Sequence, residues 1–494
     1  MIRNPFIIND AVPPEKFFNR KEILDDFTRA LSRGTRKFLW AFVAPLKFGK
    51  SSLLRKLEEI AKKFDDVIAI LLDARSEWPL KIVVSSILTQ LAGRKIELKE
   101  ELSGDLEILR KSYFRLRRDE LYTLSDFFEV VWNVLEKRNL YLLLLIDEFQ
   151  ELASGLRREV LCLREFSDRG IFKVLRSVFG NPRARVGLIV AGSVIEKLLD
   201  VIDVWNGRFF EFRLKPFSKD DSVEMLTTLF KEGGLNVPRE VIDKIVEICG
   251  CHPYYMQVMG HKIYELGSYD DESIWRAREY LWETIHGYFS RLYSSIREKG
   301  KRYVEILHLI AEGKLTYDEV AKFSDEDYSK LQDLVRMGIV FRGEEKYEII
   351  DPLFRRYVRA VPIFGEHPPG TLVICTDSEQ EVAISVQREG FAILHVRYSR
   401  GPFDLYACPR DEKGIPITTK LIGIQVKFRS SDILRISRDV LERMKLASKR
   451  YGVIPIIAFV RGRGLINFFT ELKEKYIFGT GYRTLRDALE ELSL

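Results

Sequence analysis

The chain has 494 residues and a formal net charge of +6, from 79 Lys and Arg against 73 Asp and Glu. This length exceeds one ordinary hydrophobic core and predicts two to four domains of roughly 100 to 200 residues each. The sequence has no run of about 18 apolar residues that could span a bilayer, and its start lacks the apolar stretch and cleavage site of a signal peptide. We therefore expect a cytoplasmic protein with no membrane partner.

Cysteine and charge usage narrow the class further. The five cysteines have no spacing typical of a zinc site or a disulfide framework, which predicts reduced thiols. Charged residues make up 31% of the chain and are rich in Lys, Arg and Glu, whereas Asn, Gln and Met are sparse. This balance resembles that of hyperthermophilic proteins. Residues 371–494 hold 20 basic against 15 acidic side chains, so most of the positive excess lies there. A nucleic-acid partner would contact that region first, although a surface of mixed charge explains the same bias.

A strand, a loop and a helix follow one another from residue 38. The apolar run FLWAFVAP leads into APLKFGKSSLLRKLEEIAKKF, whose later part has helical periodicity. This order is the context of a phosphate-binding P-loop, in which N–H groups at a helix N-terminus hold phosphates. Lys50 would reach the β- and γ-phosphates of a nucleotide, and the Ser51 hydroxyl would bind Mg²⁺. Alanine stands where the motif begins with glycine, and the predicted loop comprises Ala44, Pro45, Leu46, Lys47, Phe48, Gly49, Lys50, Ser51 and Ser52.

A second strand completes this predicted nucleotide site. Residues 140–148, LYLLLLIDE, form an unbroken apolar run that ends in two carboxylates. Buried parallel strands have this pattern, and their carboxyl ends face a ligand crevice. Asp147 would hold Mg²⁺ through water, and Glu148 would polarise the attacking water.

Two further strands are expected in the same sheet, at 66–76 and 184–199. The second of them ends near Ser193, which places this side chain where it could sense the γ-phosphate. Arg208 lies beside another short strand. It is a candidate phosphate sensor or an ordinary surface arginine.

Several motifs in this order resemble the archaeal ATPase family, which belongs to the STAND branch of AAA-like signal-transduction NTPases. They are NPF, FFNRKEI, the P-loop, LLLLIDEFQEL, AGS, NGR and GCHPYYMQVMGHKI, and they extend the resemblance over about residues 1–360. The resemblance implies an ATPase that binds ATP and ADP and acts as a switch rather than a fast motor. It also implies that Phe18, Asn19 and Arg20 lie near the adenine, and that Pro253 belongs to a helical lid over the nucleotide.

Residues 301–358 predict three helices followed by a hairpin. Apolar residues recur at helical spacing, Gly338 ends the third helix, and IVFRGEEKYEII contains two short strands. This pattern predicts a winged helix-turn-helix. Its third helix, 327–336, could lie in a DNA major groove, but Asp327 and Asp333 suit phosphates poorly. We favour a hinge that locks the nucleotide state, as such domains do in STAND-like ATPases.

Polar side chains recur at strand spacing near the end of the chain. Asp404 lies on a strand expected in GPFDLYA, and Gln425 and Lys427 lie on the next strand, GIQVKFR. Strand side chains alternate, so Gln425 and Lys427 share a face, and an adjacent strand can bring Asp404 to them. With Glu379 on the preceding helix, their oxygens would hold Mg²⁺ or Mn²⁺, and Lys427 would stabilise charge on a scissile phosphate. Gln425 lacks the charge of glutamate, so we expect a weaker metal site.

This segment resembles the PD-(D/E)XK nuclease superfamily, and within it the archaeal Holliday junction resolvases and Mrr-like restriction nucleases. The resemblance spans about 371–470 and rests on Glu379, GPFDLYA, the Gln-x-Lys strand and MKLASKRYGVIPIIAFV, with Phe403 in place of the usual proline. It implies cleavage of branched or foreign duplex DNA. Mrr-like members with Gln-x-Lys are known, so Gln425 does not by itself imply an inactive site. An ordinary α/β domain, or a nuclease fold used only for binding, stays open.

The predicted fold class is α/β. It combines a parallel P-loop NTPase sheet, a helical lid, a winged helix-turn-helix and an α/β domain of the restriction-endonuclease type. The expected boundaries are 1–215 for the ATPase domain, 216–295 for the lid, 296–360 for the winged helix, 361–370 for a linker and 371–494 for the nuclease-like domain. The predicted function is an ATP-dependent switch that controls a metal-dependent DNA endonuclease in repair, recombination or defence. The alternative is a nucleotide-gated regulator that binds DNA or protein and cuts nothing. We also expect a homo-oligomer, because one nuclease site cuts one strand.

Overall fold

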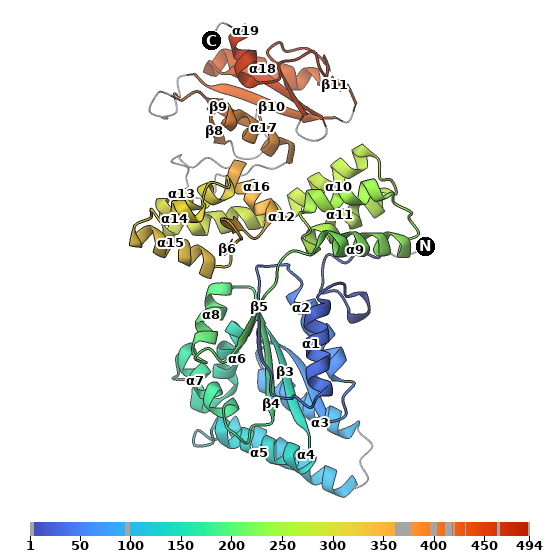
Figure 1. Ribbon diagram of the computed structural model, residues 1–494, viewed down its shortest axis with the longest axis vertical. Helices are drawn as coiled ribbons and strands as arrows, with labels where there is room; N and C mark the ends of the chain where they lie inside the picture. The colour runs from blue at the N-terminus through green and yellow to red at the C-terminus, as the bar shows by residue number, and fades with distance from the viewer. Residues whose placement is uncertain are drawn as a thin grey trace. The chain divides into compact units, whose positions relative to one another are not determined.

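The chain divides into two compact units (Figure 1). The amino-terminal unit comprises Asn9–Phe217 and Arg336–Ile339, and the carboxy-terminal unit comprises Met1–Ile8, Ser218–Val335 and Val340–Leu494. This computed structural model describes residues 4–93, 99–360, 377–395, 403–410, 417, 420–429, 431–461 and 465–492. The predicted linker at 361–370 lies outside the described residues, and the finer domain boundaries remain predictions.

A five-stranded parallel sheet forms the centre of the amino-terminal unit. Its order is β2-β3-β4-β1-β5, and its strands are β1 (Leu39–Val43), β2 (Val67–Asp73), β3 (Tyr141–Asp147), β4 (Val186–Gly192) and β5 (Phe210–Arg213). Leu142 and Leu144 of β3 belong to one core cluster, while Leu143 and Leu145 are buried on the opposite face. The apolar run that ends in two acids is therefore a strand covered on both sides, as its sequence predicts.

Helices cover both faces of this sheet. They are η1 (Pro14–Lys16), α1 (Lys21–Ser32), α2 (Lys50–Ala61), α3 (Pro79–Ala92), α4 (Lys99–Leu116), α5 (Leu124–Lys137), η2 (Phe149–Glu151), α6 (Leu152–Glu159), η3 (Leu161–Leu163), α7 (Asp168–Phe179) and α8 (Ile195–Asp203). In Figure 1, α1 and α2 lie on one face and α7 and α8 on the other. Helix α2 packs across β2, β3 and β4. The loop between β1 and α2 thus lies at the carboxyl edge of the sheet, where parallel α/β proteins bind ligands.

The carboxy-terminal unit begins with helices and a hairpin. Its elements up to residue 360 are α9 (Lys219–Glu232), α10 (Arg239–Cys249), α11 (Pro253–Leu266), α12 (Asp271–Lys299), α13 (Lys301–Ala311), α14 (Tyr317–Val320), α15 (Asp325–Arg336), β6 (Val340–Arg342), β7 (Tyr347–Ile349) and α16 (Pro352–Ala360). The strands β6 and β7 pair antiparallel. From α13 to β7 the order of elements is the one that the sequence predicts. Helix α12 is 29 residues long, but no helix in the described part of the chain is both long and apolar enough to cross a membrane.

A second five-stranded sheet follows, in the order β13-β12-β10-β9-β8. Among the described strands of this second sheet, β10 and β12 pair in parallel, whereas the other neighbouring strands pair antiparallel. The elements here are α17 (Asp377–Arg388), β8 (Ala392–His395), β9 (Leu405–Cys408), β10 (Ile422–Phe428), β11 (Ile433–Arg435), α18 (Arg438–Tyr451), β12 (Ile454–Arg461), β13 (Leu465–Phe469), β14 (Lys475–Ile477) and α19 (Leu485–Glu491). Apolar residues of α17 and α19 pack on one face of the sheet, and those of α18 pack on the other.

Candidate functional sites

The loop between β1 and α2 turns sharply before the helix begins at Lys50. Gly49 has a φ of +83°, a left-handed angle that favours glycine. Ala44, at the position of the motif's first glycine, is buried and is not among the residues with positive φ. Alanine is therefore accommodated there without backbone strain. The first turn of α2 directs its N–H groups toward the loop, as phosphate binding requires.

The side chains of Lys50, Ser51 and Asp147 converge at the carboxyl edge of the sheet. Lys50 is only 6% exposed, and its ammonium donates hydrogen bonds of 2.7 Å to the carbonyl oxygens of Ala44 and Pro45. Burial lowers the pKa of Lys50 to about 8, against the charges of Glu148 and Asp147. The Ser51 hydroxyl donates a hydrogen bond to Asp147 Oδ2. The hydroxyl and the carboxylate are hard oxygen donors, so this pair fits a Mg²⁺ ion.

Glu148 and Ser193 meet directly at the ends of β3 and β4. Glu148 Oε2 accepts hydrogen bonds from Ser193 N at 3.0 Å and from Ser193 Oγ at 2.8 Å. Burial opposes ionisation of this carboxyl, but the hydrogen bonds from Ser193 and Gln150, with the charge of Lys50, hold the pKa of Glu148 below its ordinary value. The carboxylate is thus ionised and fixed in position near Lys50.

Two neighbouring side chains, Gln150 and Arg75, were not found by sequence reasoning. Gln150 Nε2 donates a hydrogen bond of 2.7 Å to Glu148 Oε2. Arg75 follows β2, and its hydrogen bonds to Asp73 raise its pKa, with further contributions from the charges of Glu148 and Asp147. A signal was present in the sequence, because β2 ends in an aspartate as β3 does. Their register pairs these two strand ends in the sheet.

Arg208 lies at the other edge of the sheet, which corrects its prediction as a phosphate sensor. It precedes β5 by two residues, and β5 runs parallel to β1. Its guanidinium lies beside Gly180, which precedes β4. Residues that precede parallel strands lie at the amino edge, whereas the P-loop follows β1 at the carboxyl edge. Arg208 therefore does not join Lys50 and Asp147.

The segment predicted near the adenine is fixed by several contacts within the amino-terminal unit. Asn19 and Arg20, next to Phe18, have left-handed backbone angles, with φ of 68° and 62°. Arg20 Nη2 donates to the Lys215 carbonyl at 2.7 Å. Upstream, the N–H of residue 12 donates to Ser52 Oγ at 2.9 Å, which joins this segment to α2.

Pro253 belongs to the carboxy-terminal unit rather than to the unit that holds the P-loop. It is buried and occupies the first position of α11. Proline is favoured there because the first helical N–H has no partner within the helix. Its contact with a nucleotide remains a prediction.

A second polar cluster forms where β9 and β10 pair in the carboxy-terminal unit. Asp404 lies just before β9, one residue outside the strand expected to carry it, and its N–H donates to the Ile424 carbonyl at 2.9 Å. Its Oδ2 accepts hydrogen bonds from the side-chain amide of Gln425 and, at 2.7 Å, from the N–H of Val426. Burial raises the pKa of Asp404, while the charge of Lys427 opposes the shift. The structure thus brings Asp404, Gln425 and Lys427 together.

Phe403 and Gly423 explain one departure from the nuclease motif. A Cβ on Gly423 would lie 2.6 Å from atoms of the Phe403 ring. The ring is buried in the core beneath α18. A glycine in the Gln-x-Lys strand therefore makes room for phenylalanine where the motif has proline.

Glu379 is also buried, at 8% exposure, but it lies on α17. The apolar residues of α17 pack on the face of the sheet opposite α18, together with Ile424 and Val426. Because strand side chains alternate, Gln425 and Lys427 point to the other face. Within the described residues there is no group of three or more His, Cys, Asp or Glu side chains placed to hold a metal ion. The part of Glu379 in a shared metal site remains a prediction.

Comparison with known proteins supports the fold of the larger part of the chain. No protein-family model and no curated protein matches the sequence. Among solved structures, a Walker-type ATPase of Pyrococcus abyssi is similar at 22% identity and a TM-score of 0.50, over 72% of this chain and 99% of that chain. The ORC2 protein of Aeropyrum pernix matches at 16% identity and a TM-score of 0.45, over 72% of this chain and 97% of its own. The Holliday junction resolvase Hjc of Archaeoglobus fulgidus matches at 18% identity and a TM-score of 0.19, over 22% of this chain and 92% of its own.

The parallel sheet, the loop between β1 and α2 and the acids after β3 define the fold of a P-loop ATPase. The chain shares this fold with the Walker-type ATPase of Pyrococcus abyssi. At 22% identity the likeness extends to the fold alone.

Proposed function

We propose that the chain binds and hydrolyses ATP and uses the nucleotide state as a switch of the STAND type. The observation that carries the proposal is the convergence of buried Lys50 with the Ser51–Asp147 hydrogen bond at one sheet edge. Ser51 and Asp147 would hold Mg²⁺, which neutralises phosphate charge when it is bound. Lys50 would contact the β- and γ-phosphates, and Glu148, held by Ser193, would orient the attacking water.

We further propose that the nucleotide state controls a metal-dependent DNA nuclease in the carboxy-terminal α/β domain. Asp404 and Gln425 offer a carboxylate and an amide oxygen at one place, and the charge of Lys427 reaches Asp404. With Glu379 these groups would hold Mg²⁺ or Mn²⁺, which activates water and stabilises phosphate charge when it is bound. Lys427 would stabilise charge on the scissile phosphate. The substrate in this proposal is branched or foreign duplex DNA, cut by a homo-oligomer.

The helices and hairpin of residues 301–349 serve in this proposal as a winged-helix hinge rather than a DNA reader. Three acids of α15, Glu326, Asp327 and Asp333, are already engaged within the domain. Arg302 Nη2 lies 2.7 Å from Asp327 Oδ2, and the Tyr303 hydroxyl donates to Asp333. Lys330 pairs with Glu326 on the same helix. Helix α15 therefore presents few unpaired cations to a phosphate backbone, which supports the hinge.

Paired variants test the two activities separately. Lys50→Ala should abolish ATP turnover, and Lys427→Ala should abolish metal-dependent nicking of plasmid and four-way junction DNA while it leaves ATP turnover intact. Lys62→Ala at the end of α2 and Lys445→Ala on α18 remove exposed lysines from the same domains and serve as controls. The nicking assay is run with and without ATP, and both assays are run in Mg²⁺ and in Mn²⁺. If wild type and Lys427→Ala leave DNA equally intact, the nuclease proposal is wrong.

A regulator that binds DNA or protein without cutting is the second candidate. The observation that favours it is that Gln425 directs its amide N–H toward Asp404, which satisfies the carboxylate without a cation. Such a protein would bind DNA in a nucleotide-dependent way and show no nicking in either metal. A wild-type protein that nicks DNA only with metal would exclude it.

A further inference from the structure

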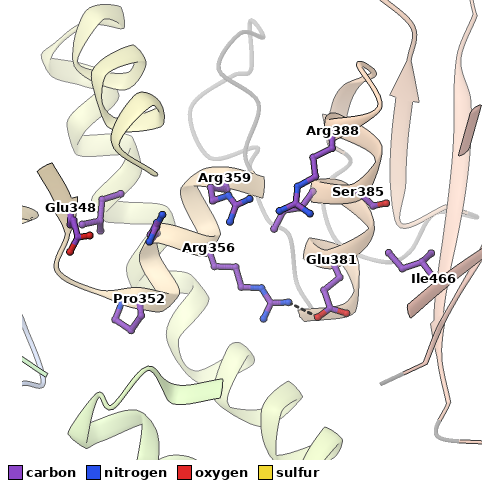
Figure 2. A pocket seen from close by; sticks show the side chains of 11 residues that line it. Glu348, Pro352, Arg356, Arg359, Glu381, Ser385, Arg388 and Ile466 are labelled. Atoms are coloured by element: carbon purple, nitrogen blue, oxygen red, sulfur yellow. Dashed lines mark hydrogen bonds and ion pairs between the residues drawn. The ribbon is translucent and has the colours of Figure 1, made fainter. Parts of the chain in front are cut away.

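A cavity of about 580 Å³ lies between α16 with the β6–β7 hairpin on one side and α17 on the other (Figure 2). All its lining residues belong to the carboxy-terminal unit. Four arginines and two glutamates line it, which leaves a net charge of +2: Arg355, Arg356, Arg359, Arg388, Glu348 and Glu381. Neither the P-loop nor the Asp404 cluster contributes to this cavity.

Glu381 is already shared between two arginines. Its Oε1 lies 2.8 Å from Arg278 Nη2 and 3.0 Å from Arg356 Nη2. Figure 2 shows the Arg356 side chain reaching across the cavity to Glu381. Burial, with the positive charge of Arg278, lowers the pKa of Arg356 to about 9 despite the opposing charge of Glu381. Two guanidinium groups therefore share the single negative charge of Glu381, so this charge does not neutralise the other arginines of the cavity.

Arg359 and Arg388 complete the positive lining from two facing helices. In Figure 2 their side chains extend toward one another from α16 and α17. Neither forms a hydrogen bond or an ion pair with another residue in the described parts of the chain. Burial lowers the pKa of Arg359, and the charges of Arg388 and Arg355 add to this effect. The positive charges of Arg359 and Arg388 repel one another, so the arrangement is suited to an anion that enters from outside.

The chemistry of the wall indicates which anion fits. Guanidinium groups bind phosphate oxygens in pairs of parallel hydrogen bonds, and several converge here. The volume suits a group of nucleotide size rather than a single small ion. Ile349, Pro352, Ile384 and Ile466 provide an apolar wall beside the arginines, against which a sugar or base could pack.

We propose that this cavity binds backbone phosphates of a nucleic-acid strand through Arg359 and Arg388, with Arg355 beside them. The inference rests on the proposed function only in taking DNA as that nucleic acid. Helix α17 also packs on the sheet that carries Asp404, so a strand held here would lie in the same unit as the proposed nuclease site.

The test measures DNA binding in full-length protein that cannot cut. Arg359→Gln/Arg388→Gln is compared with the parent in a Lys427→Ala background without divalent metal. Fluorescence anisotropy is recorded with a duplex and a single strand over a range of salt concentrations. The slope of log affinity against log salt concentration should become less negative by about 2, because each lost phosphate contact contributes about 0.9 to its magnitude. A double control, Arg276→Gln/Arg443→Gln, removes two arginines paired along their own helices, and its slope should equal the parent's.

A second pair of measurements excludes a merely structural role. Arg359→Lys/Arg388→Lys should keep the slope, since both charges remain, while it loses several-fold in affinity because the paired hydrogen bonds are lost. The melting temperature of the double Gln variant should equal or exceed that of the parent, because repulsion is relieved. A lower melting temperature, or a slope equal to the control's, would overturn the proposal.

A third measurement separates a nucleic-acid strand from a free nucleotide. In a Lys50→Ala background, ADP and inorganic pyrophosphate are added as the only phosphate ligands. Stabilisation by either ligand that is lost in Arg359→Gln/Arg388→Gln, with DNA affinity unchanged, would show a free-nucleotide site and overturn the assignment. If wild type does not nick DNA, the proposed nuclease activity is wrong. The salt dependence of DNA binding still tests the proposed phosphate site.

Discussion

The side-chain amide of Gln425 donates a hydrogen bond to Asp404. Asp404 is largely buried, and burial raises its pKa while Lys427 opposes the shift. In a nuclease that uses glutamate at this position, a cation would offset the repulsion between two carboxylates. Here the amide satisfies Asp404 in the absence of metal. We therefore expect the cluster to be stable when it is empty and to bind metal weakly.

Gln425→Glu should therefore make the stability of the protein depend on bound metal. Without metal, two adjacent carboxylates should lower the free energy of unfolding by about 1–3 kcal/mol. With Mn²⁺ or Mg²⁺, the melting temperature should rise more than it does in the wild type. Thermal unfolding against metal concentration measures both effects. Asp404→Asn is the matched control and should abolish the metal response, while an equal response in wild type and Gln425→Glu would contradict the prediction.

Gly423→Ala should destabilise the carboxy-terminal domain through Phe403. The new Cβ would lie 2.6 Å from the ring, which forces the strand or the ring to move and costs about 1–3 kcal/mol. Phe403→Leu combined with Gly423→Ala should recover part of that loss. Gly287→Ala on α12 is the control, because its Cβ would meet nothing nearer than 3.7 Å. Chemical denaturation should show Gly287→Ala to be stabilising by about 0.5–1 kcal/mol. If Gly423→Ala leaves the free energy of unfolding unchanged, the strand adjusts to the new Cβ and the prediction is wrong.

The buried pair Tyr255 and Asp351 should make stability fall as pH rises from about 4 to 6. The Tyr255 hydroxyl donates to Asp351, which also accepts from the N–H groups of Leu353 and Phe354 at the start of α16. Burial raises the pKa of Asp351 from 3.8 to about 6 despite these bonds. Between these values the folded chain keeps a proton that the unfolded chain has lost. The stabilisation, about 3 kcal/mol, is therefore complete below pH 4 and lost above pH 6.

Unfolding of wild type, Asp351→Asn and Tyr255→Phe across this pH range tests the assignment. Asp351→Asn should remove this part of the pH dependence. Tyr255→Phe removes a donor to the carboxylate, so the decline should extend to higher pH. An unchanged profile in Asp351→Asn would assign the dependence to another group.

Glu381→Gln should loosen the junction between α16, α17 and α12. The carboxylate is 14% exposed and lies within 3.0 Å of both Arg278 and Arg356. Its loss leaves two largely buried arginines without this counter-charge, and such losses cost about 3–5 kcal/mol. Hydrogen exchange should rise in α16 and α17. Glu272→Gln breaks an exposed pair with Arg276 and should cost under about 1 kcal/mol. Similar exchange in the two variants would show that the buried network contributes little.

Local sequence was sufficient to predict the P-loop, the strand β3 and the two acids at its end. An unbroken apolar run ending in Asp147 and Glu148 is typical of a strand buried on both faces, and the glycine before Lys50 is typical of a tight turn. These patterns depend on neighbours along the chain, so they predict the loop, the strand and their acids. The position of Ser193 beside Glu148 was also predictable. Site residues in a parallel sheet follow their strands, as Ser193 follows β4 and Glu148 follows β3. Arg208 precedes its strand, and the same rule places it at the other edge.

The remaining contacts were decided by the tertiary structure. The residues that form them lie far apart in the chain, and their spacing follows neither the helical nor the strand period. The sequence by itself determined the P-loop, the two-faced strand β3 and the Gln-x-Lys strand, since each is written in consecutive residues. Only the folded chain showed that Gln425 satisfies Asp404, that α17 with Glu379 covers the opposite face of the sheet, and that Arg359 faces Arg388. Hydrogen bonds and electrostatic repulsion depend on distance in space, and spacing along a chain specifies that distance only within one helix, strand or turn.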